Sequence, residues 1–223
     1  MANHAVLAGA TGLVGAEVLR QLAVDARFDR VVVLARSPAG AGGAKLAERR
    51  VDFSRPAEWA GEVRGDCAVC CLGTTIKRAG SRGAFRAVDF DMAFAFARAA
   101  RENGVPHFLL VSALGANARS SMFYMRVKGE LEEAVRGLGF PSLTLLRPSL
   151  LTGPRKEKRF AEAVARAVAP LYDFVMVGPL KKYRSVAGAV VARALVESAA
   201  RPPAGLRLLE GDAIAAYAAT PHD

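Results

Sequence analysis

The chain has 223 residues, of which 52% are hydrophobic and 23% charged, as is usual for a soluble globular protein. This length suits one large α/β domain. No apolar run approaches the ~20 residues that a membrane-spanning helix needs. The amino terminus has no basic region ahead of an apolar core, so we expect neither a membrane segment nor a signal peptide.

The net charge of +10 attracts anions in general. Most basic residues are scattered, and the denser clusters are Arg155, Lys156, Lys158, Arg159 and then Lys181, Lys182, Arg184. No aromatic residues are interleaved with them as a base-stacking surface would require. The pattern favours a solvated basic face, and we expect no nucleic-acid and no membrane partner.

A glycine-rich motif opens the chain, as the sequence HAVLAGATGLVG. The apolar run 5–8 leads into Gly9, Gly12 and Gly15, and an amphipathic stretch follows over 13–23. Strand, tight turn and helix in this order are typical of a dinucleotide-binding loop, in which backbone amides at the helix start meet the pyrophosphate. The alternative is a glycine-rich turn with no ligand. The residues expected to contact the cofactor here are Gly9, Thr11, Gly12, Leu13, Val14 and Gly15.

The β-branched run 31–34 predicts a buried second strand, which Arg36 and Ser37 follow directly. An acidic residue near this point binds the ribose 2′-hydroxyl of NAD, whereas an arginine accommodates the 2′-phosphate of NADP. No Asp or Glu occurs from 31 through 45. We therefore expect NADP(H) rather than NAD(H), with Arg36 as an ordinary surface residue the alternative.

The next elements predict further parallel strands. A short third strand is expected over 50–53, and Ser54 is expected to cap the helix that contains Trp59. The apolar run 66–72 predicts a strand covered on both faces. Gly73 and Thr74 end it at the carboxyl edge of the sheet, where open α/β folds bind their ligands.

Three cysteines, Cys67, Cys70 and Cys71, lie within this strand. Zinc usually takes four ligands, and the three histidines do not share the cysteine spacing, so we expect no metal site. Strand alternation points Cys70 away from its two companions. Core thiols too few for a disulfide framework favour a reducing compartment, and we expect a cytoplasmic protein.

An alanine-rich helix is predicted over 86–103, ended by Gly104 and Pro106. Strands are predicted over 108–111, which Ser112 follows, and over 143–146, which Arg147 and Pro148 close. A helix between these strands starts near Ser121, its expected cap. The alternation of strands and helices predicts an α/β fold, a doubly wound parallel sheet of the Rossmann type.

The chain is expected to form a single nucleotide-binding domain over 1–223. Its Rossmann core spans 1–148, and a short C-terminal extension over 149–223 supplies elements on the substrate side. This extension is predicted to contain a helix over 160–169, a loop with Gly178 and Pro179, a helix over 186–199 and a strand over 206–209.

Tyr124 and Lys128 stand four residues apart, so both side chains lie on one face of the helix after the fifth strand. Free tyrosine ionises near pH ~10, and a nearby ammonium favours its phenolate. Tyr124 could then exchange a proton with a carbonyl or alcohol oxygen that Ser112 also binds, while a cofactor transfers the hydride. The alternative is an amphipathic helix with an exposed tyrosine and lysine.

GATGLVG, YMRVK, the strand-end Ser112 and RPSLLTGP together resemble an atypical or extended short-chain dehydrogenase/reductase over nearly the whole chain. CCLGTT and SSMFYMRVKGE are most similar to the small branch around the Tat-interacting oxidoreductase. The resemblance implies a Rossmann fold, NADP(H) binding and a catalytic set of Ser112, Tyr124 and Lys128.

By position, the resemblance also matches Arg36 to the 2′-phosphate site, Lys128 to the nicotinamide ribose and Pro148 to the border of the nicotinamide. Two positions depart from the family pattern. Ala113 stands where many relatives carry a second hydroxyl, and Asp89 lies where the family's helix asparagine is expected.

These features favour an NADP(H)-dependent oxidoreductase that acts on a small carbonyl or alcohol. One alternative is a non-catalytic NADPH-binding regulator, which would not require the tyrosine–lysine pair. Another is a nucleotide-sugar epimerase, although only about 75 residues follow Pro148. The expected partner is a small-molecule substrate, and a homodimer is compatible with the sequence.

Overall fold

The structure is a computed structural model that describes residues 3–40, 42–152 and 185–218. Its main sheet has seven parallel strands in the order β3-β2-β1-β4-β5-β6-β9. These strands are β1 (Asn3–Ala8), β2 (Phe28–Ala35), β3 (Leu46–Arg50), β4 (Cys67–Cys70), β5 (His107–Val111), β6 (Ser142–Arg147) and β9 (Gly205–Glu210). Two short strands, β7 (Leu151–Thr152) and β8 (Val186–Ala187), pair separately.

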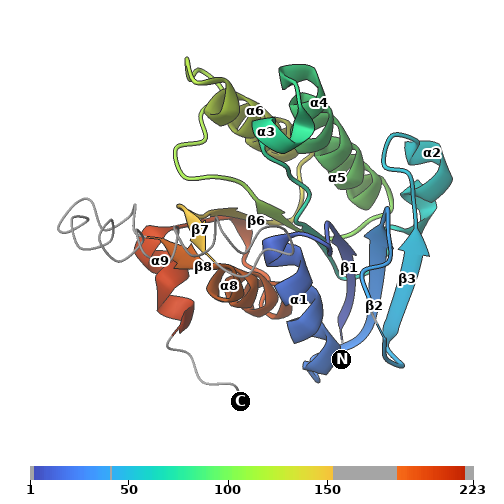
Figure 1. Ribbon diagram of the computed structural model, residues 1–223. Helices are drawn as coiled ribbons and strands as arrows, with labels where there is room; N and C mark the ends of the chain where they lie inside the picture. The colour runs from blue at the N-terminus through green and yellow to red at the C-terminus, as the bar shows by residue number, and fades with distance from the viewer. Residues whose placement is uncertain (1–2, 41, 153–184, 219–223) are drawn as a thin grey trace, which may run out of the picture.

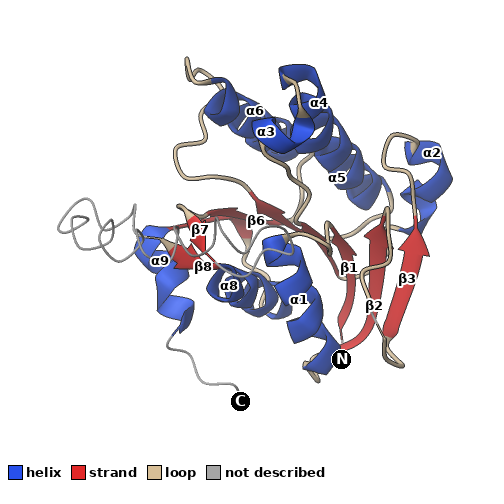
Figure 2. Ribbon diagram, in the orientation of Figure 1, coloured by secondary structure: helices blue, strands red, loops and turns tan. Residues whose placement is uncertain are grey.

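Helices cover both faces of the sheet (Figure 1). One face carries α1 (Leu13–Val24) and α8 (Gly188–Ala200), with α9 (Gly211–Ala215) and the 3₁₀ turn η4 (Ala216–Ala218) beyond them. The other face carries α2 (Pro56–Trp59), η1 (Ala60–Glu62), α3 (Ile76–Ala79), α4 (Arg82–Arg86), the π-helical segment η2 (Ala87–Met92), α5 (Ala93–Glu102) and α6 (Phe123–Gly137). Figure 2 shows the sheet between these two layers.

Each face of the sheet has its own apolar core, because side chains alternate along every strand. Leu7 and Val33 face α1 and α8, whereas Val6 and Leu34 face α2, α5 and α6. Burial on both faces explains why the central strands are continuous apolar runs. The predicted doubly wound Rossmann-type sheet is confirmed.

The cysteines follow the expected alternation. Cys67 and Cys71 pack on the α1 side and Cys70 on the opposite side. Burial raises the pKa of the Cys67 thiol to about 12 and that of Cys70 to about 11. No group of His, Cys, Asp and Glu side chains within the described residues could hold a metal ion. These thiols therefore act as small apolar side chains.

Two expectations about the edge of the sheet are wrong. The third strand spans Leu46–Arg50 and not 50–53. Ser54 does not cap the following helix, since Arg55 takes the N-cap position without a side-chain bond. The Ser54 hydroxyl instead forms a local hydrogen bond, in which it donates to Asp52 Oδ1 at 2.7 Å.

The helix expected over 86–103 is longer and less regular than predicted. It begins at Arg82 as α4, passes through the π-helical η2 and ends with α5, while Gly104 follows it at φ 78° as expected. Ser121 does not cap α6 either, since Met122 takes that position with no side-chain bond.

In the C-terminal part, α8 packs against α1, and β9 extends the sheet beside β6. These two elements correspond to the helix expected over 186–199 and the strand expected over 206–209. The expected helix over 160–169, the loop with Gly178 and Pro179, and both basic clusters lie outside the described residues.

Candidate functional site

The glycine loop joins the end of β1 to the start of α1 at the centre of the sheet. Gly9 adopts φ 87°, and a Cβ there would collide with the backbone carbonyl of Cys71. A Cβ on Gly15 would collide with the carbonyl oxygen of Gly9. Both positions therefore require glycine, because other backbone segments approach them too closely for a side chain. This close packing supports the interpretation of the motif as a dinucleotide-binding loop.

The third glycine, Gly12, is exposed. A Cβ at this position would lie 3.4 Å from the oxygen of Gly9 and would not collide with it. It takes the N-cap position of α1 without a side-chain cap bond, so no side chain occupies the first amides of the helix. Thr11 is also exposed, Leu13 is half-buried and Val14 is buried in the core. An uncapped helix start of this kind fits a diphosphate.

Arg36 and Ser37 follow β2 at the same edge of the sheet, and both are exposed. Arg36 contributes to the lowering of the pKa of Asp52, which is due first to hydrogen bonds from Ser54 and then to the charges of Arg55 and Arg36. Arg36 therefore has an acidic neighbour, Asp52, although no acidic residue occurs in the interval 31–45 that surrounds Arg36 in the sequence.

Past the end of β4, Gly73 and Thr74 adjoin a buried ion pair. Lys128 Nζ lies 2.7 Å from Asp89 Oδ1, and the Thr74 amide donates to Asp89 Oδ2 at 2.8 Å. A Cβ on Gly73 would lie 3.3 Å from Asp89 Oδ1 and 3.7 Å from Lys128 Nζ. Three elements, the β4 loop, η2 and α6, therefore converge on one carboxylate.

The charge of Lys128 is maintained although its side chain is only 5% exposed. Burial lowers the pKa of Lys128, but the negative charge of Asp89, followed by the electrostatic effect of Tyr124, outweighs burial and raises it. Lys128 is therefore an ammonium at neutral pH. Tyr124 and Cys70 of β4 also contribute to raising its pKa. Tyr124 itself is half-buried, and its ring centroid lies 5.5 Å from that of Phe85.

Ser112 and Pro148 lie together beyond the ends of β5 and β6. The Ser112 amide donates to the Leu146 oxygen at 2.7 Å, and the Leu114 amide donates to the Pro148 oxygen at 3.0 Å. Ser112 is 5% exposed, and its Oγ has no hydrogen-bond partner among the described residues. A buried hydroxyl without a partner is costly, so an oxygen-bearing ligand would satisfy it.

The loop after Ser112 is held against α6 by close packing. A Cβ on Gly129 would collide with the backbone of Asn117 and Ala118, and the Asn117 amide donates to the Met125 oxygen at 3.1 Å. This contact fixes the loop that carries Ser112 relative to the helix that carries Tyr124.

Asp89 is a residue of this candidate site that was not among the site residues expected from the sequence. It stands four residues after Phe85 and four before Ala93, and all three are buried. An aspartate in an apolar helical stripe signals a buried charge that needs a partner. The sequence analysis noted Asp89 only as a departure from the family pattern.

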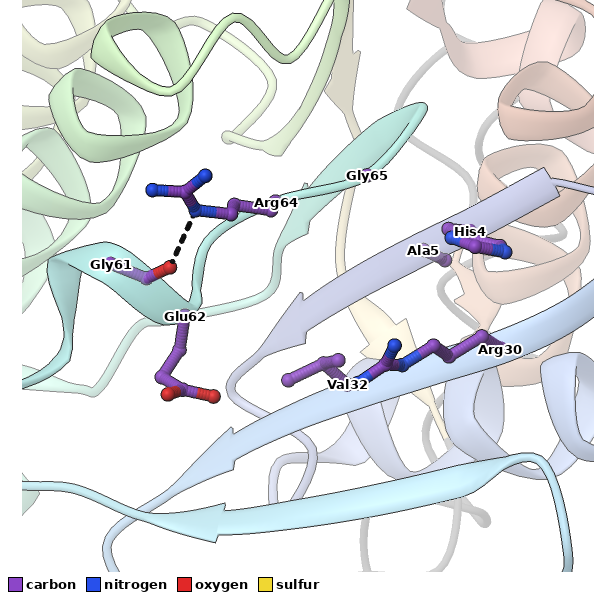
Figure 3. A pocket seen from close by; sticks show the side chains of 8 residues that line it. All are labelled: His4, Ala5, Arg30, Val32, Gly61, Glu62, Arg64 and Gly65. Atoms are coloured by element: carbon purple, nitrogen blue, oxygen red, sulfur yellow. Dashed lines mark hydrogen bonds between the residues drawn. The ribbon is translucent and has the colours of Figure 1, made fainter.

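Two cavities lie outside this group of residues. A cavity of about 230 Å³ is lined by His4, Arg30, Glu62 and Arg64, near the amino ends of β1 and β2 (Figure 3). The other, of about 260 Å³, lies beside Gly129 and Arg147, where the loop over 116–118 packs against α6. Neither includes a residue of the glycine loop.

A family model described as NAD(P)H-binding matches residues 9–202. The chain belongs to this family.

The curated relatives include the protein "fmp52, mitochondrial" of Emericella nidulans, which is 36% identical over 219 residues, covering 95% of this chain and 91% of the relative. The protein "FMP52, mitochondrial" of Debaryomyces hansenii is 31% identical over 215 residues, covering 93% and 90%. The match therefore spans nearly the whole of both chains.

Solved structures with the same fold include MoeE5 in complex with UDP-glucose and NAD, with a TM-score of 0.70 and 16% identity, covering 96% of this chain and 80% of that one. The UDP-glucose 4-epimerase of Thermus thermophilus in complex with NAD has a TM-score of 0.70 and 17% identity, covering 96% and 82%. At these identities the likeness concerns the fold.

The expected cytoplasmic location is contradicted by the relatives, whose names point to mitochondria. That expectation rested on the clustered cysteines. Because all three thiols serve packing, their number says little about the compartment. Within the described part of the chain, no helix has the length and apolar character needed to cross a bilayer.

Proposed function

We propose that the protein is an NADP(H)-dependent oxidoreductase of the short-chain dehydrogenase/reductase type, which transfers a hydride to or from a small carbonyl or alcohol. One observation carries the proposal. A buried ammonium, Lys128, is held by Asp89 one helical turn from Tyr124, at the edge of the sheet where the glycine loop also ends. An amphipathic surface helix would have no need of such a pair.

The cofactor site is assigned to the residues at the carboxyl edge of the sheet, and the bound nicotinamide would supply the hydride. The uncapped amides of α1 would hold the diphosphate. Lys128 would hold the nicotinamide ribose, and Pro148 would border the ring. Gly73 and Thr74 would line the cofactor's path past β4.

In the reductive direction, Tyr124 would donate a proton to the carbonyl oxygen, to which Ser112 also donates a hydrogen bond. The Lys128 ammonium then stabilises the phenolate that remains. Asp89 keeps the ammonium in place. The similarity to the Tat-interacting branch remains a prediction within this proposal.

Turnover with NADPH tests the function directly. A panel of quinones, aldehydes and small ketones should include substrates whose reduction consumes NADPH. Lys128→Ala should weaken both cofactor binding and turnover, because the ammonium serves the ribose and the phenol. NADPH binding without turnover of any carbonyl, combined with an NADPH-dependent change in a protein partner, would instead identify a cofactor-sensing regulator.

Preference for NADP(H) rests on Arg36 and has its own test. Calorimetric titration should show tighter binding of NADPH than of NADH, and Arg36→Ala should remove most of the difference. Arg30→Ala is the matched control, since Arg30 is an exposed arginine of β2 near the other end of the strand. Equal affinities in the unaltered protein would refute the role of Arg36.

A further inference from the structure

Two stretches of the chain that contain residues of the proposed active site carry an excess of positive charge. From Cys67 to Val88 the sequence has four basic residues and no acidic one, and from Asn103 to Gly129 it has three Lys or Arg residues and no acidic one. The first stretch includes α3 and α4, and the second includes the start of α6. Figure 1 shows these helices together on one side of the sheet.

Part of this charge is neutralised within the protein. Arg86 pairs with Glu130, Arg126 lies 3.9 Å from the same carboxylate, and Lys128 pairs with Asp89. The remaining cations are exposed and have no ion-pair partner among the described residues; they are Lys77, Arg78, Arg82 and Arg119. We call these four residues the cationic wall.

Packing ties one member of the wall, Arg82, to the start of the helix that carries Tyr124. The Arg82 guanidinium carbon lies 5.2 Å from the ring centroid of Phe123, the residue before Tyr124. Phe85 contacts both rings, with centroid distances of 5.8 Å to Phe123 and 5.5 Å to Tyr124. A guanidinium stacked on a ring keeps the N–H groups at its edge free for an oxyanion.

We propose that the substrate of this site is an anion, a carbonyl compound with a carboxylate or phosphate group that binds to the cationic wall while its carbonyl faces Tyr124. The inference rests on the proposed oxidoreductase function. The unpaired Arg82, packed on the residue before the proposed proton donor, suits such a ligand because guanidinium–oxyanion pairs are strong and directional. They would also draw the ligand in at low salt.

Binding without turnover separates this inference from the function on which it rests. Benzoate, phenyl phosphate and neutral benzamide are titrated calorimetrically into the protein saturated with NADP⁺. The two anions should bind, benzamide should bind at least about tenfold more weakly, and added salt should reduce the difference. Stronger binding of phenyl phosphate than of benzoate would assign phosphate as the preferred group.

The variant Arg82→Gln/Arg119→Gln should lose about tenfold in affinity for the anions. The control Arg64→Gln/Arg201→Gln removes the same charge from exposed positions outside the wall and should bind them normally. Turnover of para-carboxybenzaldehyde is compared with turnover of its neutral methyl ester. The wall variant should raise KM for the charged aldehyde and leave KM for the ester nearly unchanged.

Equal binding of anions and benzamide would overturn the proposal, as would equal losses in the wall variant and its control. A loss confined to NADPH affinity would assign the wall to the cofactor instead. Displacement of the anions by duplex DNA at physiological salt would assign it to nucleic acid. Anion binding without turnover of any carbonyl would support the anion site and contradict the oxidoreductase function.

Discussion

At the level of single residues, the site depends on the buried pair of Asp89 and Lys128. Neither charge could remain in the core alone, since an unpaired buried ion costs several kcal/mol. Because the pKa of Lys128 is raised, the stabilisation is present throughout the neutral range. As the pH rises above ~10.4 and through that raised pKa, the contribution of Lys128 is lost.

Asp89→Ala should lower the free energy of unfolding by about 3–5 kcal/mol at pH 7, because it leaves the Lys128 ammonium buried without a counter-charge. Asp91→Ala is the matched control, since Asp91 is exposed on the same helical segment and should change stability by less than ~0.5 kcal/mol. Urea unfolding measures both. Equal stability of the two variants would show that the pair contributes nothing.

At the level of elements, α6 and the loop over 113–121 act together because Gly129 lets their backbones touch. The same helix contains a second glycine, Gly137, whose Cβ position has no atom within 4 Å. Alanine substitutions at the two positions therefore distinguish the effect of close packing from that of helix propensity.

Gly129→Ala should destabilise the protein by about 1–3 kcal/mol, because the added methyl group overpacks the contact with Asn117 and Ala118. Gly137→Ala should be neutral or stabilising by up to ~1 kcal/mol. Thermal unfolding distinguishes the outcomes. A Gly129→Ala protein as stable as the Gly137→Ala protein would contradict the described contact.

Elements with a strong local signal were predictable from the sequence, and the others were not. The central strands are continuous apolar runs, and their positions agree with the prediction. The edge strand β3 reads LAERR and has no apolar pattern, so its position was missed by several residues. The π-helical turn that carries Asp89 was not predicted, since residue periodicity assumes a regular helix.

At the level of the whole molecule, His107 lies inside the sheet. It is 1% exposed on β5, and its Nε2 lies 3.0 Å from Thr144 Oγ1 of β6. Burial, followed by the charge of Arg207 on β9, lowers the pKa of His107 to about 4. The folded protein therefore keeps this ring neutral at pH values at which the unfolded chain protonates it.

As the pH falls, His107 is protonated in the unfolded chain before it is protonated in the folded protein. The free energy of unfolding should therefore decrease between pH ~6.5 and ~4, and His107 should account for roughly 3 kcal/mol of the decrease. His107→Gln should reduce the decrease. His4→Gln, at an exposed histidine, should not. Urea unfolding across this pH range measures the slopes, and an unchanged slope in His107→Gln would refute the assignment.

The candidate site was predictable where it depends on local motifs, as at the glycine loop and the spacing of Tyr124 and Lys128. Its ion pair was not, because Asp89 and Lys128 are distant in sequence and meet only when η2 and α6 pack together. Sequence spacing gives the face of a helix on which a residue lies but not the charge that it meets there.

Substitution of Tyr124 by Phe tests the central claim most directly. The variant keeps the ring and its packing against Phe85 but loses the oxygen that would transfer the proton. NADPH-dependent reduction of a carbonyl substrate should fall about 10²–10⁴-fold, with the Kd for NADPH nearly unchanged. Tyr217→Phe, near the C-terminal end of the described chain, is the control and should retain activity. Full activity in Tyr124→Phe would contradict the proposed mechanism.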